Sequence, residues 1–565
     1  MMAEQITSAM GCHRAGDFRG AVSGYEQVIV DPQFEELLPG ERGRILALLG
    51  AACLQCGDFS TGEGYLQRAA LFVPAQADVW SNLGLSLGHL NRAVEAVEAY
   101  RRAAELKPED ARSHVQLGDA LQMAGDPEAA LLAYEAALAR HPEFSEAYYN
   151  RGVALQSLGR REEALQSYRE AIARNPDYVE AYNNAGTLLD EQGQWGAARV
   201  HFDRVLALRP THAGAYANRG RLREVTDDLP GALVDYGESL KLAPDNPGLA
   251  WNRALLMLKC GRYQEGWPLH ERAERRLAAQ AGGYVSGAPL WDGQAPIAGK
   301  TLLIRREQGF GDALQFARYA LQIAASGGRV VLAVPAPLVR ILQTLPCQPV
   351  VIAEDKPPPP HDYQCWMLSL PYLFRTTLET IPAPPYLFPD PEAIGRWATR
   401  MSGDERPKVG VLWAGRPAAA MDGDRSFPLA TLAPVLNETG LCFYSLQKDD
   451  LGDERRRELQ ESPWADQMID WTPELKDFHE TAALIMNLDL VITADTAVLH
   501  LAGAMAKPVW LIDRKSHCWR WLAGRTDSPW YPSLTIFRQQ KMGEWDAPVA
   551  SVKATLQAHW GSYEN

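Results

Sequence analysis

The side chains best placed to do chemistry are an aspartate and a histidine close together in the second half of the sequence, Asp495 and His500. They follow a compact apolar run at 489–493, which predicts a buried strand. Asp495 directly precedes a stretch at 496–505 whose apolar residues recur at helical spacing, and His500 lies within that stretch. A second apolar run follows at 508–512. Ligands of open α/β sheets bind beyond the carboxyl ends of the strands, which is where Asp495 falls.

The start of this predicted helix is suited to an anion. Asp495 stands where an N-cap residue belongs, so the amides of Thr496 and Ala497 should point toward the mouth of the sheet. Free N–H groups and the helix dipole both favour a phosphate there. The alternative interpretation is that Asp495 only caps the helix and that His500, one turn in, packs in the core.

A second candidate lies in the turn EQGFGDALQFARYA, which follows an apolar run and opens a helical stretch. Gly309 and Gly311 allow the backbone to turn tightly and to approach a ligand. Asp312 then stands at the helix start, where it is either an N-cap residue or a general base that faces a cleft. Gln315, one turn later, is expected to line the same cleft, and Glu307 is a weaker candidate for the base.

Length and composition restrict the class of protein. A chain of 565 residues is too long for one core and predicts roughly two to four domains. With 46% apolar residues, no apolar run of transmembrane length and no evident signal peptide, the expected location is the cytoplasm. The eight cysteines form no C-x-x-C pair, which is typical of free thiols in a reducing compartment. A net charge of −14 argues against a nucleic-acid partner.

The first half of the chain is an internal repeat with a period of about 34 residues. Small residues, an aromatic residue and a proline recur at fixed places in each unit, which is the signature of a tetratricopeptide repeat. The recurring prolines are Pro74, Pro108, Pro142, Pro176, Pro210 and Pro244, and the recurring glycines are Gly84, Gly118, Gly152, Gly186 and Gly220. Such units bury their faces only against one another, so the pattern predicts an α-solenoid with a concave groove.

One polar column of the repeat indicates a function. An amide side chain stands two residues before each repeated glycine, and again at the same place in the last unit. The column consists of Asn82, Gln116, Asn150, Asn184, Asn218 and Asn252. An amide offers a donor and an acceptor together, the complement of a peptide unit, so a ladder of amides in the groove could grip an extended polypeptide. The alternative is that asparagine is simply a small polar residue tolerated on the first helix of each unit.

The second half changes to short apolar runs that alternate with helical stretches, which predicts parallel sheets. We therefore expect five parts along the chain. They are a solenoid at 1–275, a linker rich in Gly, Ala and Pro at 276–298, a first Rossmann-like lobe at 299–390, a second lobe at 391–546 and a C-terminal helix at 547–565.

The segment ADTAVLHLAGAMAKPVWLI and the turn with Gly311 and Asp312 resemble two motifs of heptosyltransferase-like glycosyltransferases of the two-lobed GT-B type. The resemblance covers 299–546 and departs from the family at Ala497, where glycine is usual. It implies two Rossmann-like lobes behind the tetratricopeptide solenoid, with a C-terminal helix that packs back on the first lobe. The solenoid resembles that of O-GlcNAc transferase, where an asparagine ladder holds the acceptor polypeptide.

The resemblance also implies roles for the candidate residues. Asp312 is the expected general base, on the lobe opposite the donor, and Gln315 is expected on the acceptor side. The diphosphate is expected at the first amides of the predicted helix, while Asp495 caps the helix or bonds a donor hydroxyl. The residues expected to bind the nucleotide sugar are Asp495, Thr496, Ala497, His500, Gly415, Arg416, Arg425, Gln447 and Lys448.

Departure of the diphosphate needs positive charge or amide donors. The sequence has no D-x-D motif with a histidine nearby, so we expect no metal and no cofactor besides the nucleotide-sugar substrate. Arg416, Arg425 and Lys448 follow predicted strands of the second lobe and are the expected cations, although Arg425 stands where family members often have lysine and could be a surface arginine. Four aromatic residues further on are expected to pack rather than to bind, namely Trp519, Trp521, Trp530 and Tyr531.

The predicted function is a metal-independent, inverting transfer of a sugar from a nucleotide sugar to a protein held in the repeat groove. Flagellin is a candidate acceptor by resemblance. One alternative keeps the fold but makes the acceptor a saccharide lipid of the cell envelope, and the lack of a basic amphipathic face counts against it. The other alternative is a repeat scaffold with a degenerate transferase domain, which the retention of both motifs disfavours.

Overall fold

The structure, a computed structural model, describes residues 2–280, 287–415, 425–448 and 454–561. The chain forms two compact units, the first ending at Leu222 and the second starting at Arg223. The predicted fold class, an α-solenoid followed by α/β lobes with parallel sheets, is confirmed. Among the described residues, no helix is both long and apolar enough to cross a membrane.

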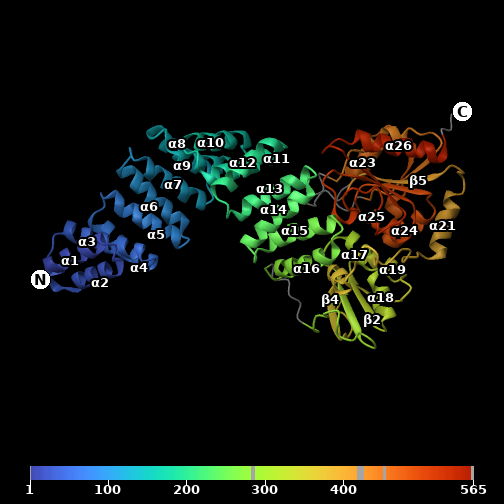
Figure 1. Ribbon diagram of the computed structural model, residues 1–565, viewed down its shortest axis with the longest axis horizontal. Coiled ribbons are helices and arrows are strands. Elements are labelled where there is room, and N and C mark those ends of the chain that lie inside the picture. Colours follow the sequence, from blue (N-terminus) through green and yellow to red (C-terminus); the bar gives the residue numbers. More distant parts are fainter. Residues whose placement is uncertain (1, 281–286, 416–424, 449–453, 562–565) are drawn as a thin grey trace. The chain divides into compact units, whose positions relative to one another are not determined.

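The first unit is a stack of paired helices (Figure 1). Its helices are α1 (Met2–Arg14), α2 (Phe18–Val30), α3 (Pro39–Gln55), α4 (Phe59–Phe72), α5 (Ala77–His89), α6 (Ala93–Leu106), α7 (Ala111–Met123), α8 (Pro127–Arg140), α9 (Ser145–Ser157), α10 (Arg161–Arg174), α11 (Val179–Glu191), α12 (Trp195–Leu208) and α13 (Ala213–Val225). Because α13 ends at Val225, the boundary between the two units falls inside a helix of the repeat pattern.

The repeated glycines let the two helices of one repeat cross closely. A Cβ built at Gly118 would lie 2.5 Å from the ring of Tyr134, and one built at Gly152 would lie 2.6 Å from the ring of Tyr168. Both tyrosines are fully buried. The small residue and the aromatic residue of the repeat are therefore two sides of one contact, and a larger residue at either glycine would push the helices apart.

The second unit begins with the last helices of the repeat pattern. These are α14 (Leu229–Leu242), α15 (Pro247–Lys259) and α16 (Tyr263–Gln280). Two of them pack on the α/β lobes: α16 contacts α20 (Leu370–Leu373) of the first lobe, and α15 contacts the short 3₁₀ helix η7 (Trp519–Trp521) of the second. The end of the solenoid and both lobes thus form one compact unit.

The first lobe is a parallel four-stranded sheet in the order β3-β2-β1-β4, with helices around it. Its elements are β1 (Thr301–Arg305), α17 (Phe310–Phe316), α18 (Tyr319–Ala325), β2 (Arg329–Val334), α19 (Val339–Leu342), β3 (Val350–Ala353), β4 (Tyr363–Trp366) and α20. The strands β1 and β2 are almost wholly buried, as their continuous apolar runs require.

The second lobe is a parallel six-stranded sheet in the order β10-β9-β8-β5-β6-β7. Its elements are α21 (Pro391–Met401), β5 (Lys408–Leu412), α22 (Ala433–Leu436), β6 (Cys442–Ser445), α23 (Glu454–Gln460), β7 (Met468–Ile469), α24 (Phe478–Met486), β8 (Leu490–Thr493), α25 (Ala497–Ala504), β9 (Val509–Asp513), η7, β10 (Leu534–Arg538) and α26 (Asp546–Trp560). The segment between β9 and β10 is a long loop that contains η7.

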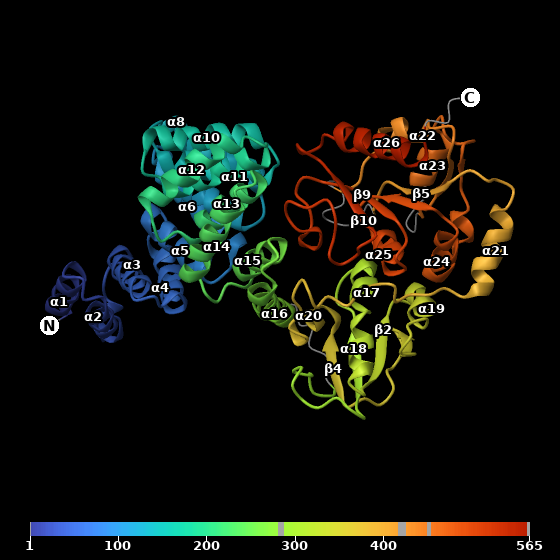
Figure 2. The same cartoon turned by 45° about the vertical axis from the view of Figure 1, so that its right-hand side comes forward.

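The expectation that the C-terminal helix packs back on the first lobe is wrong. The helix α26 lies on the second lobe, over α22, β9 and β10 (Figure 2). Its apolar side chains Val549, Val552 and Leu556 are buried in one cluster with Val409 and Val411 of β5. Burial of this apolar stripe against the nearest sheet face decides where the helix packs.

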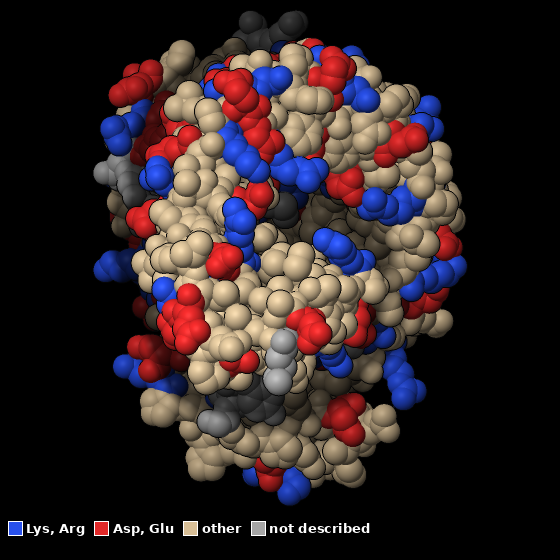
Figure 3. Space-filling model, turned by 90° about the vertical axis from the view of Figure 1, so that its left-hand side faces the viewer, with Lys and Arg blue, Asp and Glu red and all other residues tan. Residues whose placement is uncertain are grey.

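Charged side chains are numerous but mixed in sign. The chain has 56 lysines and arginines against 70 aspartates and glutamates. On the face of the molecule in Figure 3, basic and acidic side chains alternate and no broad basic patch is visible. A nucleic-acid surface would need positive charge gathered on one face or along one helix.

Candidate active site

Two segments far apart in the sequence, α17 and α25, lie side by side where the two lobes meet (Figure 2). The helix α17 carries Gly311 and Asp312, and α25 carries His500. A Cβ built at Gly311 would lie 2.6 Å from Cδ2 and 3.1 Å from Nε2 of His500. The two motifs that the sequence indicates are therefore in direct contact, and the close approach requires glycine at position 311.

Replacing Gly311 by alanine should destabilise the second unit by about 1–3 kcal/mol, because the added methyl overlaps the His500 ring and a buried contact is overpacked. Urea unfolding followed by tryptophan fluorescence measures this change. Gly395 of α21 is the matched control, since nothing lies within 4 Å of its Cβ position. Its replacement by alanine should stabilise the helix slightly, so equal losses in both variants would contradict the prediction.

Asp312 has one partner in its own helix and one on the other lobe. Its Oδ2 accepts the N–H of Gly309 at 3.1 Å, so the carboxylate bonds the N-cap residue from the third position of α17. Its Oδ1 accepts a hydrogen bond from Nη2 of Arg520 and forms an ion pair with it. The Asp312 side chain is 16% exposed and that of Arg520 11%, so both keep a little access from outside.

Gln315 shares the same arginine. It is fully buried, and its Oε1 accepts a hydrogen bond from Nε of Arg520 at 2.8 Å. Its Nε2 is buried and has no hydrogen-bond partner among the residues that the structure describes. A buried donor without a partner costs about 1–3 kcal/mol, so this N–H is a favourable contact for any ligand oxygen that reaches it.

Arg520 is the site residue that the sequence interpretation did not include. It lies in η7, in the loop between β9 and β10, beyond the carboxyl end of β9. The signal available in the sequence was its place between Trp519 and Trp521, two residues expected to pack in the core. A partly buried arginine between two core tryptophans favours an acidic partner, but only the structure shows that this partner is Asp312.

The helix α25 begins one residue later than expected. Thr496, with φ −136° and ψ 174°, is the N-cap residue, and its side chain makes no capping hydrogen bond. The prediction that Asp495 is the N-cap is therefore wrong, because the extended backbone at Thr496 delays the first turn. Asp495, Thr496 and Ala497 are half-buried, and of the first-turn amides that of Leu499 already donates to the Thr496 carbonyl at 3.2 Å.

His500 is buried between the lobes. Its Nδ1 lies 3.0 Å from the Tyr531 hydroxyl, and its ring stacks on Trp521 with the centroids 5.5 Å apart. Burial, and then the charges of Arg520 and Arg318, lower the pKa of His500 well below its ordinary value, so the imidazole is neutral. Its contact with the donor stays a prediction, and its packing at the lobe junction is what the structure shows.

Comparison with known proteins agrees with this architecture. Residues 404–548 match the model of a family described as Glycosyltransferase family 9 (heptosyltransferase). Residues 49–111, 115–179 and 155–222 match models of the tetratricopeptide repeat. The chain joins tetratricopeptide repeats to a glycosyltransferase family 9 domain. The resemblance drawn from the sequence is confirmed, and because the family match begins just before β5, α17 and Asp312 lie outside it.

Individual relatives cover parts of the chain. Protein FlbA of Caulobacter vibrioides is 29% identical over 332 residues, which is 54% of this chain and 54% of FlbA, so the chain spans about half the length of that relative. A tetratricopeptide repeat protein from Parabacteroides merdae is 15% identical, with a TM-score of 0.37, over 45% of this chain and 98% of that one. The structure of Pseudomonas aeruginosa pilF is 21% identical, with a TM-score of 0.34, over 38% and 98%.

Within the family 9 domain, side chains bond the backbone of the residues directly after β5, at 413–415. Gln447 is buried, and its Oε1 accepts the N–H groups of Trp413 at 3.2 Å and Ala414 at 2.9 Å. Gly415 donates its N–H to Oγ of Ser426 at 2.9 Å. The oxygen of Gln447 therefore supports the loop, and the nucleotide contacts expected for Gln447 and Gly415 stay predictions.

For the three cations that the sequence predicts as phosphate ligands, the structure shows other partners or no description. Lys448 is exposed, and its Nζ donates to the carbonyl of Leu475. Arg425 is half-buried and already has a partner, and Arg416 lies outside the described residues. Among the residues that the structure describes, no three histidine, cysteine, aspartate or glutamate side chains come together as a possible metal site. The roles of these cations and the absence of a metal from the reaction stay predictions.

Several amides of the repeat column join neighbouring repeats. The column is half-buried, except for Asn252, which is exposed. The hydrogen bonds run from Asn150 to Asp119 at 2.8 Å, from Asn184 to Tyr149 at 3.3 Å and from Asn218 to Asn183 at 3.2 Å. Each uses an Nδ2 donor, so these amides already contribute to stacking, and their grip on a polypeptide stays a prediction.

Glu307, the weaker candidate for the base, links the last repeat helix to the first lobe. Its Oε2 accepts the N–H of Leu368 at 2.9 Å, and its Oε1 pairs with Nη2 of Arg275 on α16 at 3.2 Å. Burial, and then the neighbouring Glu274, raise the pKa of Glu307, and burial also raises the pKa of Glu274. Both oxygens of Glu307 have partners, so it supports the junction.

These raised pKa values predict a pH dependence of stability. The unfolded chain loses the protons of Glu307 and Glu274 near the ordinary glutamate pKa of 4.5, whereas the folded chain retains them to higher pH. The contribution of these two groups to the free energy of unfolding is therefore full below pH 4.5, and it is lost as the pH rises through their pKa values in the folded chain. Glu307→Gln should flatten this decline between about pH 5 and 8. Urea midpoints across that range measure it, and parallel curves for the two proteins would contradict it.

Proposed function

We propose that the chain transfers a sugar, with inversion, from a nucleotide sugar to a protein held by its repeats. The proposal is carried by the ion pair between Asp312 of the first lobe and Arg520 of the second, at the place where α17 meets α25. Arg520 and the start of α25 lie within the residues that match the family 9 model, and the Asp312 carboxylate contacts that arginine from the first lobe. Such a transfer needs a carboxylate to take up the acceptor proton and a cation to stabilise the leaving phosphate.

Asp312 is the general base in this proposal. The acceptor hydroxyl attacks C1 of the sugar while the bond from C1 to the diphosphate oxygen breaks, and the electron pair of that bond leaves with the nucleotide diphosphate. The hydroxyl proton passes to the Asp312 carboxylate as the new bond forms. Attack from the side opposite the leaving group inverts the configuration at C1.

Arg520 and the first-turn amides of α25 receive the leaving diphosphate. A guanidinium has five N–H donors, and the described partners of Arg520 are Asp312, Gln315 and Cys518, so donors remain for a phosphate oxygen. The unpaired Nε2 of Gln315 is available to the acceptor. This arrangement stabilises the developing charge with fixed protein groups, and we propose that no metal takes part.

The acceptor in this proposal is a polypeptide in the repeat groove. A binding site on the same chain raises the concentration of acceptor near Asp312, so a weak contact at the active site is enough. We propose flagellin as the acceptor on resemblance alone. The reaction takes place in the cytoplasm in this proposal, and the eight cysteines, all free in the structure, fit a reducing compartment.

Isothermal titration calorimetry with a panel of nucleotide sugars tests the donor, and intact mass measurement of purified flagellin after incubation tests the acceptor. We expect one donor to bind with a dissociation constant in the range of about 1 μM to 1 mM and to add its sugar to the protein. If no nucleotide sugar binds, the transferase function is wrong and a repeat scaffold remains. Transfer to a saccharide lipid but to no protein would replace the proposed acceptor only.

A further inference from the structure

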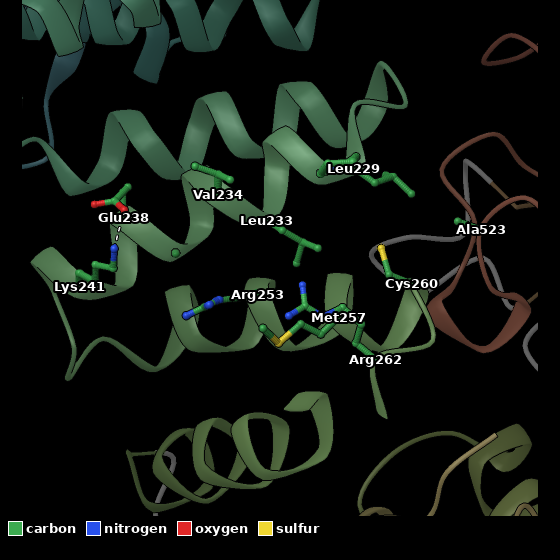
Figure 4. A pocket seen from close by; sticks show the side chains of 12 residues that line it. Leu229, Leu233, Val234, Glu238, Lys241, Arg253, Met257, Cys260, Arg262 and Ala523 are labelled. Carbon is green, nitrogen blue, oxygen red and sulfur yellow. Dashed lines mark hydrogen bonds and ion pairs between the residues drawn. The ribbon is translucent and has the colours of Figure 1, made fainter. Parts of the chain in front are cut away.

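A cavity of about 770 Å³ lies between α14, α15 and the loop that carries Arg520 (Figure 4). Leu233, Val234 and Met257 give it aliphatic walls, and Arg253 projects between the two helices. Ala523, three residues after Arg520 in the same loop, lines the cavity on the transferase side.

The cavity lies where an arginine lacks the carboxylate that its equivalent has one repeat earlier. One repeat earlier, Arg219 of α13 pairs with Asp203 of α12 at 2.7 Å. The equivalent positions in the next repeat are Arg253 of α15 and Gly237 of α14, so the arginine is retained and its carboxylate is absent. A Cβ built at Gly237 would lie 3.7 Å from the guanidinium carbon of Arg253, within reach of the missing interaction.

Arg253 therefore has a donor that is not satisfied. Its Nε is buried and has no hydrogen-bond partner among the described residues. The neighbouring cations are neutralised, since Lys241 pairs with Glu238 and Arg262 with Glu265, each at 2.6 Å. A planar guanidinium bonds a carboxylate best, so a ligand carboxylate is the group that fits the vacant position.

We propose that this cavity binds a segment of the acceptor polypeptide in which a carboxylate side chain stands next to an aliphatic one. The carboxylate pairs with Arg253, in the place that Asp203 occupies one repeat earlier, and the aliphatic side chain packs on Leu233 and Met257. This inference rests on the proposed transfer to a protein. The lining does not include Asn252, so the cavity is a contact separate from the amide column.

The position of the cavity connects acceptor binding with the proposed active site. Ala523 donates its N–H to the carbonyl of Lys259 on α15 at 2.9 Å, and Trp530 donates its Nε1–H to the hydroxyl of Tyr263 on α16 at 2.9 Å. The last repeat helices therefore hold both ends of the loop segment that follows Arg520. A polypeptide bound in the cavity lies against the loop whose arginine contacts Asp312.

Gly237→Asp tests the inference by placing beside Arg253 the carboxylate that stands at the equivalent position one repeat earlier. Aspartate is no worse than glycine inside a helix, so the fold should be retained. The probes are short fluorescein-labelled peptides that differ only in a central Leu-Asp, Leu-Asn or Leu-Lys pair, and fluorescence anisotropy with the full chain gives their affinities. The Leu-Asp peptide should bind the unaltered protein about tenfold more tightly than the Leu-Asn peptide, and Gly237→Asp should remove that preference.

Two further variants separate the cavity from a general charge effect. Val200 of α12 occupies the position equivalent to Val234 one repeat earlier, and the two valines are similarly exposed, at 64% and 61%. Val200→Asp therefore adds the same charge outside the cavity and should leave the preference for the Leu-Asp peptide intact. Gly237→Leu fills the cavity without a charge and should weaken the binding of all three peptides.

Equal affinities for the Leu-Asp and Leu-Asn peptides, or an unchanged preference in Gly237→Asp, would overturn the inference, as would displacement of the peptide by a free nucleotide. None of these measurements needs a nucleotide sugar, so failure of the donor titration would remove the proposed function alone.

Discussion

Replacing Asp312 by asparagine should lower kcat for sugar transfer by about 10²–10⁴-fold, which is the usual contribution of a positioned general base. The asparagine side chain has nearly the same shape and still accepts the N–H of Gly309, but it cannot take up the acceptor proton. The donor is expected on the other lobe, so its affinity should change little. Transfer kinetics with saturating donor, together with a calorimetric donor titration, measure the two effects separately.

Loss of activity in this variant must be distinguished from loss of structure, because Asp312 is also the ion partner of Arg520. Weakening a hydrogen bond to a charged group costs about 1.5–3 kcal/mol, which a melting curve detects. Glu307→Gln is the matched control, since it alters another buried carboxylate of the same lobe whose partners are Arg275 and Leu368. Its kcat should stay close to that of the unaltered protein, and a large loss there with full activity in Asp312→Asn would reverse the assignment of the base.

Replacing Arg520 by glutamine should lower kcat and kcat/KM together by about 10²–10³-fold, because charge on the leaving diphosphate develops mainly in the transition state. Glutamine still has a donor and an acceptor for Gln315, but the positive charge is lost. Arg520→Lys should lie between the two, since an ammonium keeps the charge but loses the planar fork that bonds several oxygens at once. Single-turnover kinetics with the identified donor measure the chemical step directly.

Arg525 provides the matched control for this substitution. It lies in the same loop, is exposed and pairs with Asp527 at 2.6 Å, so Arg525→Gln removes an arginine without touching Asp312. Its kinetics should be unchanged. If Arg520→Gln lowers only the melting temperature and leaves kcat unchanged, Arg520 is a structural link between the lobes, and the diphosphate is held elsewhere.

The features that were predicted correctly depend on residues close together in the chain. The contact of Gly118 with Tyr134 recurs at Gly84, Gly152 and Gly186, so its period is visible without any knowledge of the fold. The strand, helix, strand pattern around α25 rests on apolar spacing over a short stretch in the same way. Apolar spacing does not determine the residue at which a helix begins, because one residue in extended conformation moves the helix start without altering the apolar pattern. The N-cap of α25 is accordingly Thr496 and not the predicted Asp495.

Contacts between distant residues were not accessible in that way. Arg520 and Asp312 are 208 residues apart, and no local spacing joins them. The packing of α26 on the second lobe was likewise mispredicted, since its apolar stripe could cover either lobe equally well. The empty place beside Arg253 became visible only by comparison with the pair Arg219 and Asp203, once both were located on adjacent helices.

The sequence by itself determined that this protein joins a tetratricopeptide solenoid to a heptosyltransferase-like domain, and it identified the two short motifs around Asp312 and His500. Local periodicity and short motifs suffice for that, since helices, strands and turns form from neighbouring residues. Only the tertiary structure decided that Gly311 touches His500, that Arg520 pairs with Asp312 and that the last repeat helices belong to the same compact unit as the two α/β lobes. Those contacts depend on the burial of apolar faces from separate elements against one another, and that packing brings together residues between which the sequence has no spacing to read.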